Sequence, residues 1–191
     1  MRTIKIFAHI SLDGVISPGD EDNDYSNGGW TAAYRTPEGA AAVAEAQGAD
    51  FDLLLGRRTY DLWAGFWPNA PRSPFADHLN AATKYVATRQ PDGLRWGPAV
   101  SLGEEVAGRL RDLKSSDGPD LVAWGSTSVT SLLFEEGLVD EVALMVIPVL
   151  LGRGKRFFTG ESRDLALISS QATPSGVVLN RYRYVGPVAP A

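Results

Sequence analysis

Short apolar runs that alternate with helical segments constrain the fold of this chain most. Residues 51–55 (FDLLL) and 121–124 (LVAW) are almost wholly apolar, a pattern typical of strands that are covered on both faces of a sheet. Helix signals lie between such runs. The clearest is at 36–48, where Thr36 can cap the helix and Pro37 occupies its first position. Strands that alternate with helices predict a mostly parallel sheet with right-handed crossovers.

The C-terminal part departs from this alternation, because strands follow one another there without a helix. Residues 141–147 form a predicted strand, and a hairpin that turns at 173–176 follows. The predicted fold class is therefore α/β: a single three-layer domain over residues 1–191, with helices on both faces of a mostly parallel sheet and a C-terminal antiparallel hairpin. The other predicted strands are 3–10 and 84–88, and the other predicted helices are 57–63, a segment from Ser73, 103–115 and 126–137.

Composition and charge exclude several classes of protein. The chain has no cysteine, which removes disulfides, thiolate catalysis and zinc–thiolate sites. Its 18 basic and 23 acidic residues give a net charge of −5, which argues against a nucleic-acid binder. The longest apolar run, 142–151, contains Pro148 and is half a membrane span. We therefore expect a cytoplasmic protein that acts on a small molecule, with no nucleic-acid, membrane or metal partner.

Three predicted strands end in unusual turns. They are Gly56-Arg57-Arg58-Thr59, Thr88-Arg89 and Gly125-Ser126-Thr127-Ser128-Val129. In an open α/β sheet, ligands bind beyond the carboxyl ends of the strands, where helix N-termini attract anions. Arg57 and Arg89 on neighbouring strands would form a clamp for a phosphate monoester. Two simpler interpretations stay open: solvated arginines in a plain turn at 56–59, and N-capping by Ser126 or Thr127.

Asp13 is the acidic residue whose position points to chemistry, because it ends the first strand beside the expected cleft. It is the candidate for protonating or orienting a substrate, directly or through water; the alternative is that Asp-Gly only forms a good turn. Residues 17–29 are polar, and we expect this loop to close over the substrate. His9 is expected to line the cleft or to lie satisfied in the core, and His78 to lie on an exposed helix face.

Taken together, these segments resemble the dihydrofolate reductase-like fold, and the chain is similar to stand-alone relatives of the C-terminal reductase domain of riboflavin biosynthesis. The segments SLDG, GRRT, ATR, WGSTSV and IPVLLGRG carry the resemblance, at 11–14, 56–59, 87–89, 124–129 and 147–154. It implies NADPH as the hydride donor. By the family pattern, Arg57, Thr88 and Arg89 would hold the adenosine 2′-phosphate. The pyrophosphate would lie along Gly56, Thr59 and the helix start with Gly125, Ser126, Thr127 and Val129, and Ile16 would pack near the nicotinamide.

The chain also departs from the family pattern. Dihydrofolate reductases carry a carboxylate early in the first helix, whereas residues 39–42 here are GAAA, which argues against a folate substrate. We therefore expect an NADPH-dependent reductase that transfers a hydride to a C=N or C=O carbon of a small pyrimidine- or pteridine-like heterocycle. This would be similar to 5-amino-6-(5-phosphoribosylamino)uracil reductase or dihydrofolate reductase. The alternative is a catalytically silent nucleotide- or drug-binding protein on the same fold. The resemblance also implies a homodimer, with the strand at 142–151 at its interface.

Overall fold

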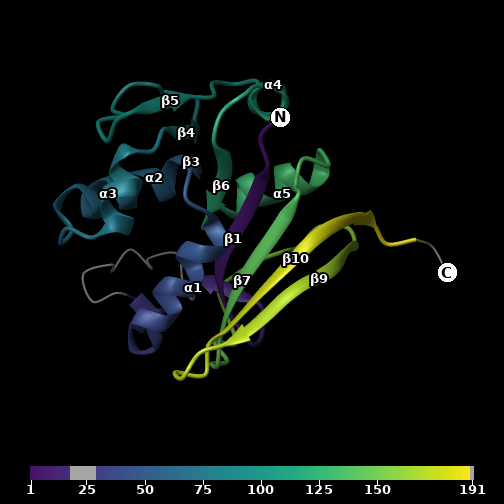
Figure 1. Ribbon diagram of the computed structural model, residues 1–191. Coiled ribbons are helices and arrows are strands. Elements are labelled where there is room, and N and C mark those ends of the chain that lie inside the picture. The colour runs from purple at the N-terminus through teal and green to yellow at the C-terminus, as the bar shows by residue number, and fades with distance from the viewer. Residues whose placement is uncertain (18–28, 190–191) are drawn as a thin grey trace.

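An eight-stranded sheet organises the chain in the computed structural model, which describes residues 1–17 and 29–189 (Figure 1). Six neighbouring strands are parallel, and the last two run antiparallel to their neighbours. Across the sheet the order is β5 (Ala99–Ser101), β4 (Lys84–Ala87), β3 (Phe51–Gly56), β6 (Asp120–Trp124), β1 (Ile4–Ser11), β7 (Glu141–Ile147), β10 (Val178–Pro187) and β9 (Arg163–Ala172). The predicted parallel sheet with a C-terminal antiparallel hairpin is confirmed.

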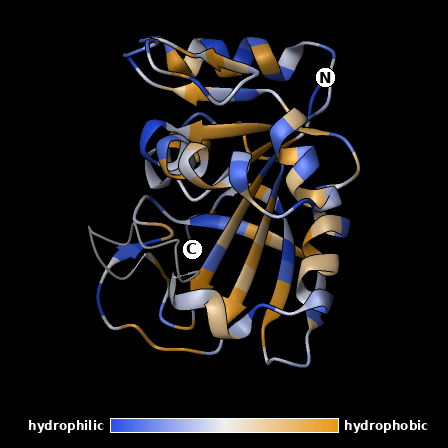
Figure 2. Cartoon of the chain, turned by 90° about the vertical axis from the view of Figure 1, so that its left-hand side faces the viewer, coloured by the Kyte–Doolittle hydropathy of each residue, from blue (hydrophilic) through white to orange (hydrophobic). Residues whose placement is uncertain are grey.

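Helices lie on both faces of the sheet, so the chain has three layers. One face packs against α1 (Pro37–Gln47), α2 (Arg57–Phe66) and α3 (Pro74–Ala81), and the other against α4 (Val106–Ser115) and α5 (Thr127–Glu135). Successive strand residues contribute to opposite faces: Leu53 and Leu55 to the first, Leu54 to the second. Hydrophobic residues accordingly run along the central strands (Figure 2), and these strands need apolar side chains on both sides.

Local signals fix most element boundaries where the sequence predicts them. Thr36 accepts a hydrogen bond from the Gly39 N–H at 3.1 Å, so the predicted cap is confirmed. Ser73 caps α3 in the same way, by accepting the Ala76 N–H at 3.1 Å. The fourth helix begins later than predicted, at Val106 rather than Gly103. Gly103 has φ +66°, a left-handed conformation that lies outside a helix, and its N–H binds the Ser101 side chain.

Two short strand pairings were not predicted. One joins β5 to β4 at the edge of the sheet. The other joins β2 (Val15–Ser17) to β8 (Lys155–Arg156) in a separate two-stranded sheet. These strands are two or three residues long and pair across a large separation in sequence, so no local pattern marks them. The remaining elements are the 3-10 helices η2 (Gly29–Tyr34) and η3 (Trp67–Asn69).

The strand that we expected at a dimer interface lies inside the sheet. β7 pairs with β1 on one side and with β10 on the other, and Val142 and Ile147 are buried. The exposed apolar side chains of this region lie farther out, on the edge strand β9, where Leu167 and Ile168 are exposed. No helix in the described part of the chain is long and apolar enough to cross a membrane.

Candidate functional site

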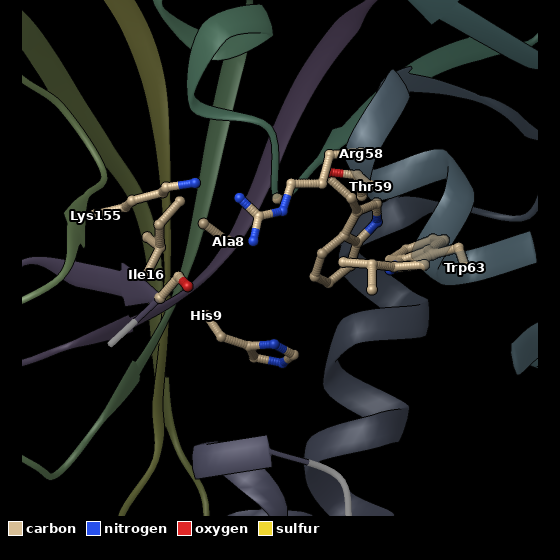
Figure 3. A pocket seen from close by; sticks show the side chains of 11 residues that line it. Ala8, His9, Ile16, Arg58, Thr59, Trp63 and Lys155 are labelled. Carbon is tan, nitrogen blue, oxygen red and sulfur yellow. The ribbon is translucent and has the colours of Figure 1, made fainter. Parts of the chain in front are cut away.

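A cavity of about 150 Å³ opens at the carboxyl ends of β1, β3 and β6 (Figure 3). This is the edge where ligands bind in open α/β sheets. Aromatic, small and basic side chains line it, and none of the described lining residues is acidic. The lining residues are Ala8, His9, Ile16, Ser17, Arg58, Thr59, Leu62, Trp63, Trp124, Gly125 and Lys155. Ile16, Thr59 and Gly125, three of the predicted cofactor-binding residues, are thus brought together.

The ends of β3 and β6 approach each other closely at Gly56 and Ser126. A Cβ atom at Gly56 would lie 2.3 Å from the Ser126 Oγ and 3.2 Å from the Ser126 Cβ, so a side chain here would force the Ser126 side chain to shift. Val129 Cγ2 would lie 3.8 Å from the same position. Gly125 has φ +62°, and a Cβ there would contact Thr59. The two glycine turns therefore lie against each other, each next to a side chain of the other, at the ends of β3 and β6.

The helices that start at these two turns have no side-chain cap. Gly56 is the N-cap of α2 and has no side chain, and Ser126 is the N-cap of α5 but its side chain makes no capping bond. The Ser126 hydroxyl instead lies 3.3 Å from the Ser128 hydroxyl. The simple N-capping interpretation is therefore wrong for Ser126; Thr127 is the first residue of α5 rather than its cap. Uncapped N–H groups at a helix start favour a bound anion.

Arg57, Thr88 and Arg89 lie together at a second place, beyond the cavity-lining residues. The Arg57 Nη1 donates to the backbone oxygen of Gln90 at 2.8 Å, which ties the start of α2 to the segment after β4. The Thr88 hydroxyl accepts the Gln90 N–H at 3.0 Å, and Arg89 is exposed. Arg57 also forms a 2.9 Å ion pair with Asp61. Arg57 therefore holds this turn, and its side chain stays partly exposed to solvent.

The neighbouring arginine, Arg58, faces the cavity instead. Its guanidinium extends toward the Lys155 ammonium from the opposite wall (Figure 3). Sequence reasoning missed both residues as site residues. The sequence holds one signal for Arg58. Arg57 and Asp61 have the i,i+4 spacing of an ion pair along a helix, so Arg57 is expected to point toward Asp61, and Arg58 toward the ends of the strands. Lys155 gave no signal, because the β2–β8 pairing brings it to the cavity.

Asp13 holds the segment that carries Lys155. Its carboxylate accepts the Ser11 hydroxyl at 2.6 Å and the backbone N–H groups of Leu151 and Gly152 at 3.0 and 2.7 Å. The Ser11 hydroxyl first, then the two N–H groups, lower the pKa of Asp13 to about 2. The carboxyl group is therefore ionised at neutral pH and carries no proton to donate. This geometry favours a positioning role for Asp13 over the protonating role in our sequence hypothesis.

His9 lies on β1 and lines the cavity, as one of the two alternatives for it predicted. Its ring centroid is 5.6 Å from that of Trp124. Burial, and then the positive charge of Arg35, lower the pKa of His9 to about 4, so the imidazole is neutral at pH 7. The other histidine, His78, is half-buried, and its Nε2 lies 3.2 Å from the Phe51 backbone oxygen. The prediction of an exposed His78 was therefore wrong.

Residues 18–28 of the loop expected to close over the substrate lie outside the described residues, and only its ends, Ser17 in β2 and Gly29 in η2, are described. No group of acidic, histidine or cysteine side chains that could hold a metal ion occurs within 1–17 and 29–189.

Comparison with known proteins places the chain in a family. Residues 2–179 match the family model described as the RibD C-terminal domain. The uncharacterized protein YyaP of Bacillus subtilis (strain 168) is 28% identical over 140 residues, which cover 70% of this chain and 74% of YyaP.

Two similar solved structures support the same fold. A putative riboflavin biosynthesis protein from Shewanella sp. PV-4 has a TM-score of 0.68 at 21% identity, covering 96% of this chain and 99% of that one. Dihydrofolate reductase from Enterococcus faecalis, complexed with NADP(H) and RAB-propyl, has a TM-score of 0.64 at 13% identity, covering 95% and 96%. Because the family model matches nearly the whole chain, this chain belongs to the RibD C-terminal domain family.

Proposed function

We propose that this protein is an NADPH-dependent reductase that transfers a hydride to a C=N or C=O carbon of a small heterocyclic substrate. The observation that carries the proposal is the meeting of two glycine turns, at Gly56 and Gly125, with the uncapped starts of α2 and α5 at the edge of one cavity. The membership in a reductase-type family supports the same chemistry. The E. faecalis neighbour is complexed with NADP(H).

The residues at the two turns fit a pyrophosphate. Glycine at position 56 lets the end of β3 lie against the Ser126 side chain, which brings the two turns together. The N–H groups at the starts of α2 and α5 would donate to phosphate oxygens, and the positive ends of both helices would favour the charge. Arg58 adds a guanidinium on the cavity wall. Of the predicted set, Gly56, Thr59, Gly125, Ser126, Thr127 and Val129 would lie along this group.

The group formed by Arg57, Thr88 and Arg89 fits the 2′-phosphate that distinguishes NADPH from NADH. Arg57 is held in place by Asp61 and by the Gln90 backbone oxygen, so its guanidinium is ordered before any ligand binds. Arg89 lies exposed on the same turn, next to Thr88. Because a phosphate monoester is a dianion, two arginines satisfy it better than one. We therefore assign Arg57, Thr88 and Arg89 to the 2′-phosphate.

The protein's own contribution is positioning and the exclusion of water. The nicotinamide supplies the hydride when the cofactor is bound. Ile16, Leu62 and Trp63 give the cavity apolar walls, which hold a flat ring in place and keep water away from the reacting carbon. Asp13 fixes the segment 151–152, and with it the β2–β8 pair that brings Lys155 to the cavity. Each of these roles serves hydride transfer between two bound rings.

One observation favours the alternative, a protein that binds the nucleotide without turnover. No carboxylate lines the cavity in the described part of the chain, and Asp13 is ionised, so no acidic side chain there is placed to protonate a substrate. A reductase with this cavity would act on a substrate that needs no acidic side chain for its protonation, or that takes its proton from water.

A turnover screen separates the two functions. The purified protein is mixed with NADPH and a panel of pteridines, pyrimidines and quinones, and oxidation is followed by the loss of NADPH absorbance. The proposal predicts acceptor-dependent oxidation, which Arg58→Ala lowers about 10- to 100-fold at subsaturating NADPH, the effect of one charge-assisted hydrogen bond. Arg72→Ala, at an exposed arginine outside the site, should leave the rate unchanged. Tight NADPH binding without oxidation by any acceptor would favour the alternative.

A further inference from the structure

A second cavity, of about 330 Å³, lies between the later part of α5 and the segment that leads from β8 into β9. Its aromatic residues, Phe134 and Phe158, belong to the core on one face of the sheet, whereas Trp63 and Trp124 of the first cavity belong to the core on the other face. The two cavities share no lining residue. Small-molecule sites have volumes of about 300–1,000 Å³, so this cavity is large enough to hold a ligand.

Arg163 is the basic residue of the second cavity, and its guanidinium is incompletely satisfied. The side chain is only 13% exposed. Its Nη1 donates to the Ser162 backbone oxygen at 3.2 Å and lies 3.5 Å from a carboxylate oxygen of Glu161. Within residues 1–17 and 29–189, neither the buried Nε nor Nη2 has a hydrogen-bond partner. A charged group that is largely removed from water is stabilised by acceptors on its donors, so a ligand carboxylate at Nη2 would supply an acceptor that the protein lacks.

Arg181 shows what distinguishes Arg163. Its Nε is also buried without a partner, but its Nη2 forms a 2.9 Å ion pair with Glu141, and it lines neither cavity. The Glu161 carboxylate is 89% exposed and 3.5 Å away from Arg163. An ion pair of this length with an exposed partner contributes little, so Arg163 remains available to an anionic group.

Two carboxylates at the same cavity determine the rest of the charge. Glu135 and Glu161 both line it and are exposed, and Glu135 has no ion pair within the described residues. A simple anion would be attracted by Arg163 but repelled by the two glutamates, and a simple cation would be repelled by Arg163. A zwitterion places a negative group at Arg163 and a positive group at Glu135, so the charges of the cavity favour a ligand that carries both.

The aromatic side of the cavity favours an apolar portion of the ligand. The rings of Phe134 and Phe158 are 5.2 Å apart and inclined by 74°. Gly160 lies directly against the Phe158 ring, because a Cβ there would be 3.2 Å from the Phe158 Cζ. Aromatic side chains in this arrangement offer apolar surface that a hydrophobic side chain can cover.

We propose that the second cavity binds a free α-amino acid with an apolar side chain. Its carboxylate accepts from Arg163, its ammonium lies at Glu135, and its side chain contacts Phe134 and Phe158. This is a site separate from the one assigned to the cofactor, and the inference does not rest on the proposed function.

Three probes that share one phenyl ring test the charge requirement. They are phenylalanine, 3-phenylpropionate, which lacks the ammonium, and 2-phenylethylamine, which lacks the carboxylate. Each is titrated into ¹⁵N-labelled full-length protein, and the amide signals are followed by NMR. Arg163→Met removes the guanidinium and keeps an apolar stem, and Glu135→Gln removes one charge. Arg109→Met is the matched control, at an exposed arginine of α4 that lines neither cavity.

Phenylalanine is expected to shift the amide signals of Ser131 and Gly160 and to leave that of Gly125, in the first cavity, unchanged. 2-Phenylethylamine should bind at least about tenfold more weakly, the effect of one charge-assisted hydrogen bond. 3-Phenylpropionate should bind about two- to fivefold more weakly, because its missing partner is an exposed carboxylate. For phenylalanine, Arg163→Met should lose at least about tenfold in affinity, Glu135→Gln about two- to fivefold, and Arg109→Met nothing.

The inference is overturned if phenylalanine leaves the Gly160 signal in place, if it shifts Gly125 instead, or if 2-phenylethylamine binds as tightly as phenylalanine. Full affinity in Arg163→Met would overturn it as well. If Arg163→Met lacks the dispersed amide spectrum of a folded protein, the three probes on the wild type decide the question. None of these results depends on NADPH, so failure of the proposed function, seen as absent NADPH binding, remains a separate outcome.

Discussion

Replacement of Gly56 by alanine tests whether the two strand ends meet as closely as the structure shows. The new methyl group would lie 2.3 Å from the Ser126 Oγ and 3.2 Å from its Cβ. Rotation of the hydroxyl relieves only the first contact and breaks its 3.3 Å contact with Ser128. Overpacking of this kind costs about 1–3 kcal/mol. Alanine also stabilises the fold by about 0.4–1 kcal/mol, because it lowers the conformational entropy of the unfolded chain. The net expectation is that Gly56→Ala lowers the free energy of unfolding by about 1–2 kcal/mol.

The assay is urea unfolding followed by circular dichroism, with Gly56→Ala, Ser126→Gly and the double variant measured together. Ser126→Gly removes the atoms that the methyl group would meet, and it breaks no cap because the Ser126 side chain makes none. The double variant should therefore be more stable than the sum of the two single effects predicts, by about 1 kcal/mol or more. Full stability of Gly56→Ala, or strictly additive effects, would refute the close approach of the two turns to which the pyrophosphate is assigned.

Three further predictions concern charge and assembly. The pKa of Asp13 is lowered from 3.8 to about 2, so the ionised carboxylate contributes to stability fully above pH 3.8 and loses this contribution as the pH falls through 2. The difference in urea stability between the wild type and Asp13→Asn should therefore shrink as the pH is lowered from 3.8 to 2. Burial is the main cause that lowers the pKa of Lys84 from 10.5 to about 8. Between pH 8 and 10.5 the folded chain therefore binds fewer protons than the unfolded chain, and the stability of the wild type should rise relative to that of Lys84→Met. An unchanged stability difference between the two proteins over this range would contradict the prediction. We propose that the chain forms a homodimer in solution through the exposed apolar side chains of β9. Light scattering should then give a mass of twice 20.5 kDa for the wild type and the mass of the monomer for Leu167→Glu. A monomeric wild type would contradict the proposal.

Features that depend on local sequence were predictable. Hydroxyl caps, glycine ends and short apolar runs fix α1, β3 and β6 almost to the residue, because the signals lie within each element. The sheet type followed from the alternation of strands and helices. Glycine and hydroxyl residues after β3 and β6 also marked the edge of the sheet at which the cavity opens, since parallel strands present their carboxyl ends on the same side.

Features that depend on contacts between distant segments were not predictable. Arg57 and Arg58 are adjacent in sequence and stand about 100° apart around a helix, so Arg57 points toward the segment after β4 and Arg58 toward the cavity. Asp13 is the clearest case. Its hydrogen bonds to the backbone at 151–152 convert a candidate proton donor into an anionic anchor, and nothing near residue 13 in the sequence indicates that partner. Lys155 reaches the cavity for the same reason, through a strand pair of two or three residues.

Calorimetric titration with NADPH and NADH side by side tests the central claim most directly. We expect NADPH to bind the wild type in the micromolar range and NADH at least about tenfold more weakly, because only NADPH carries the phosphate that Arg57 and Arg89 are proposed to hold. Arg89→Ala should remove most of that difference by weakening NADPH alone. Absence of binding by either nucleotide, or equal affinity for both, would contradict the assignment of this cavity and its arginine cluster to NADPH.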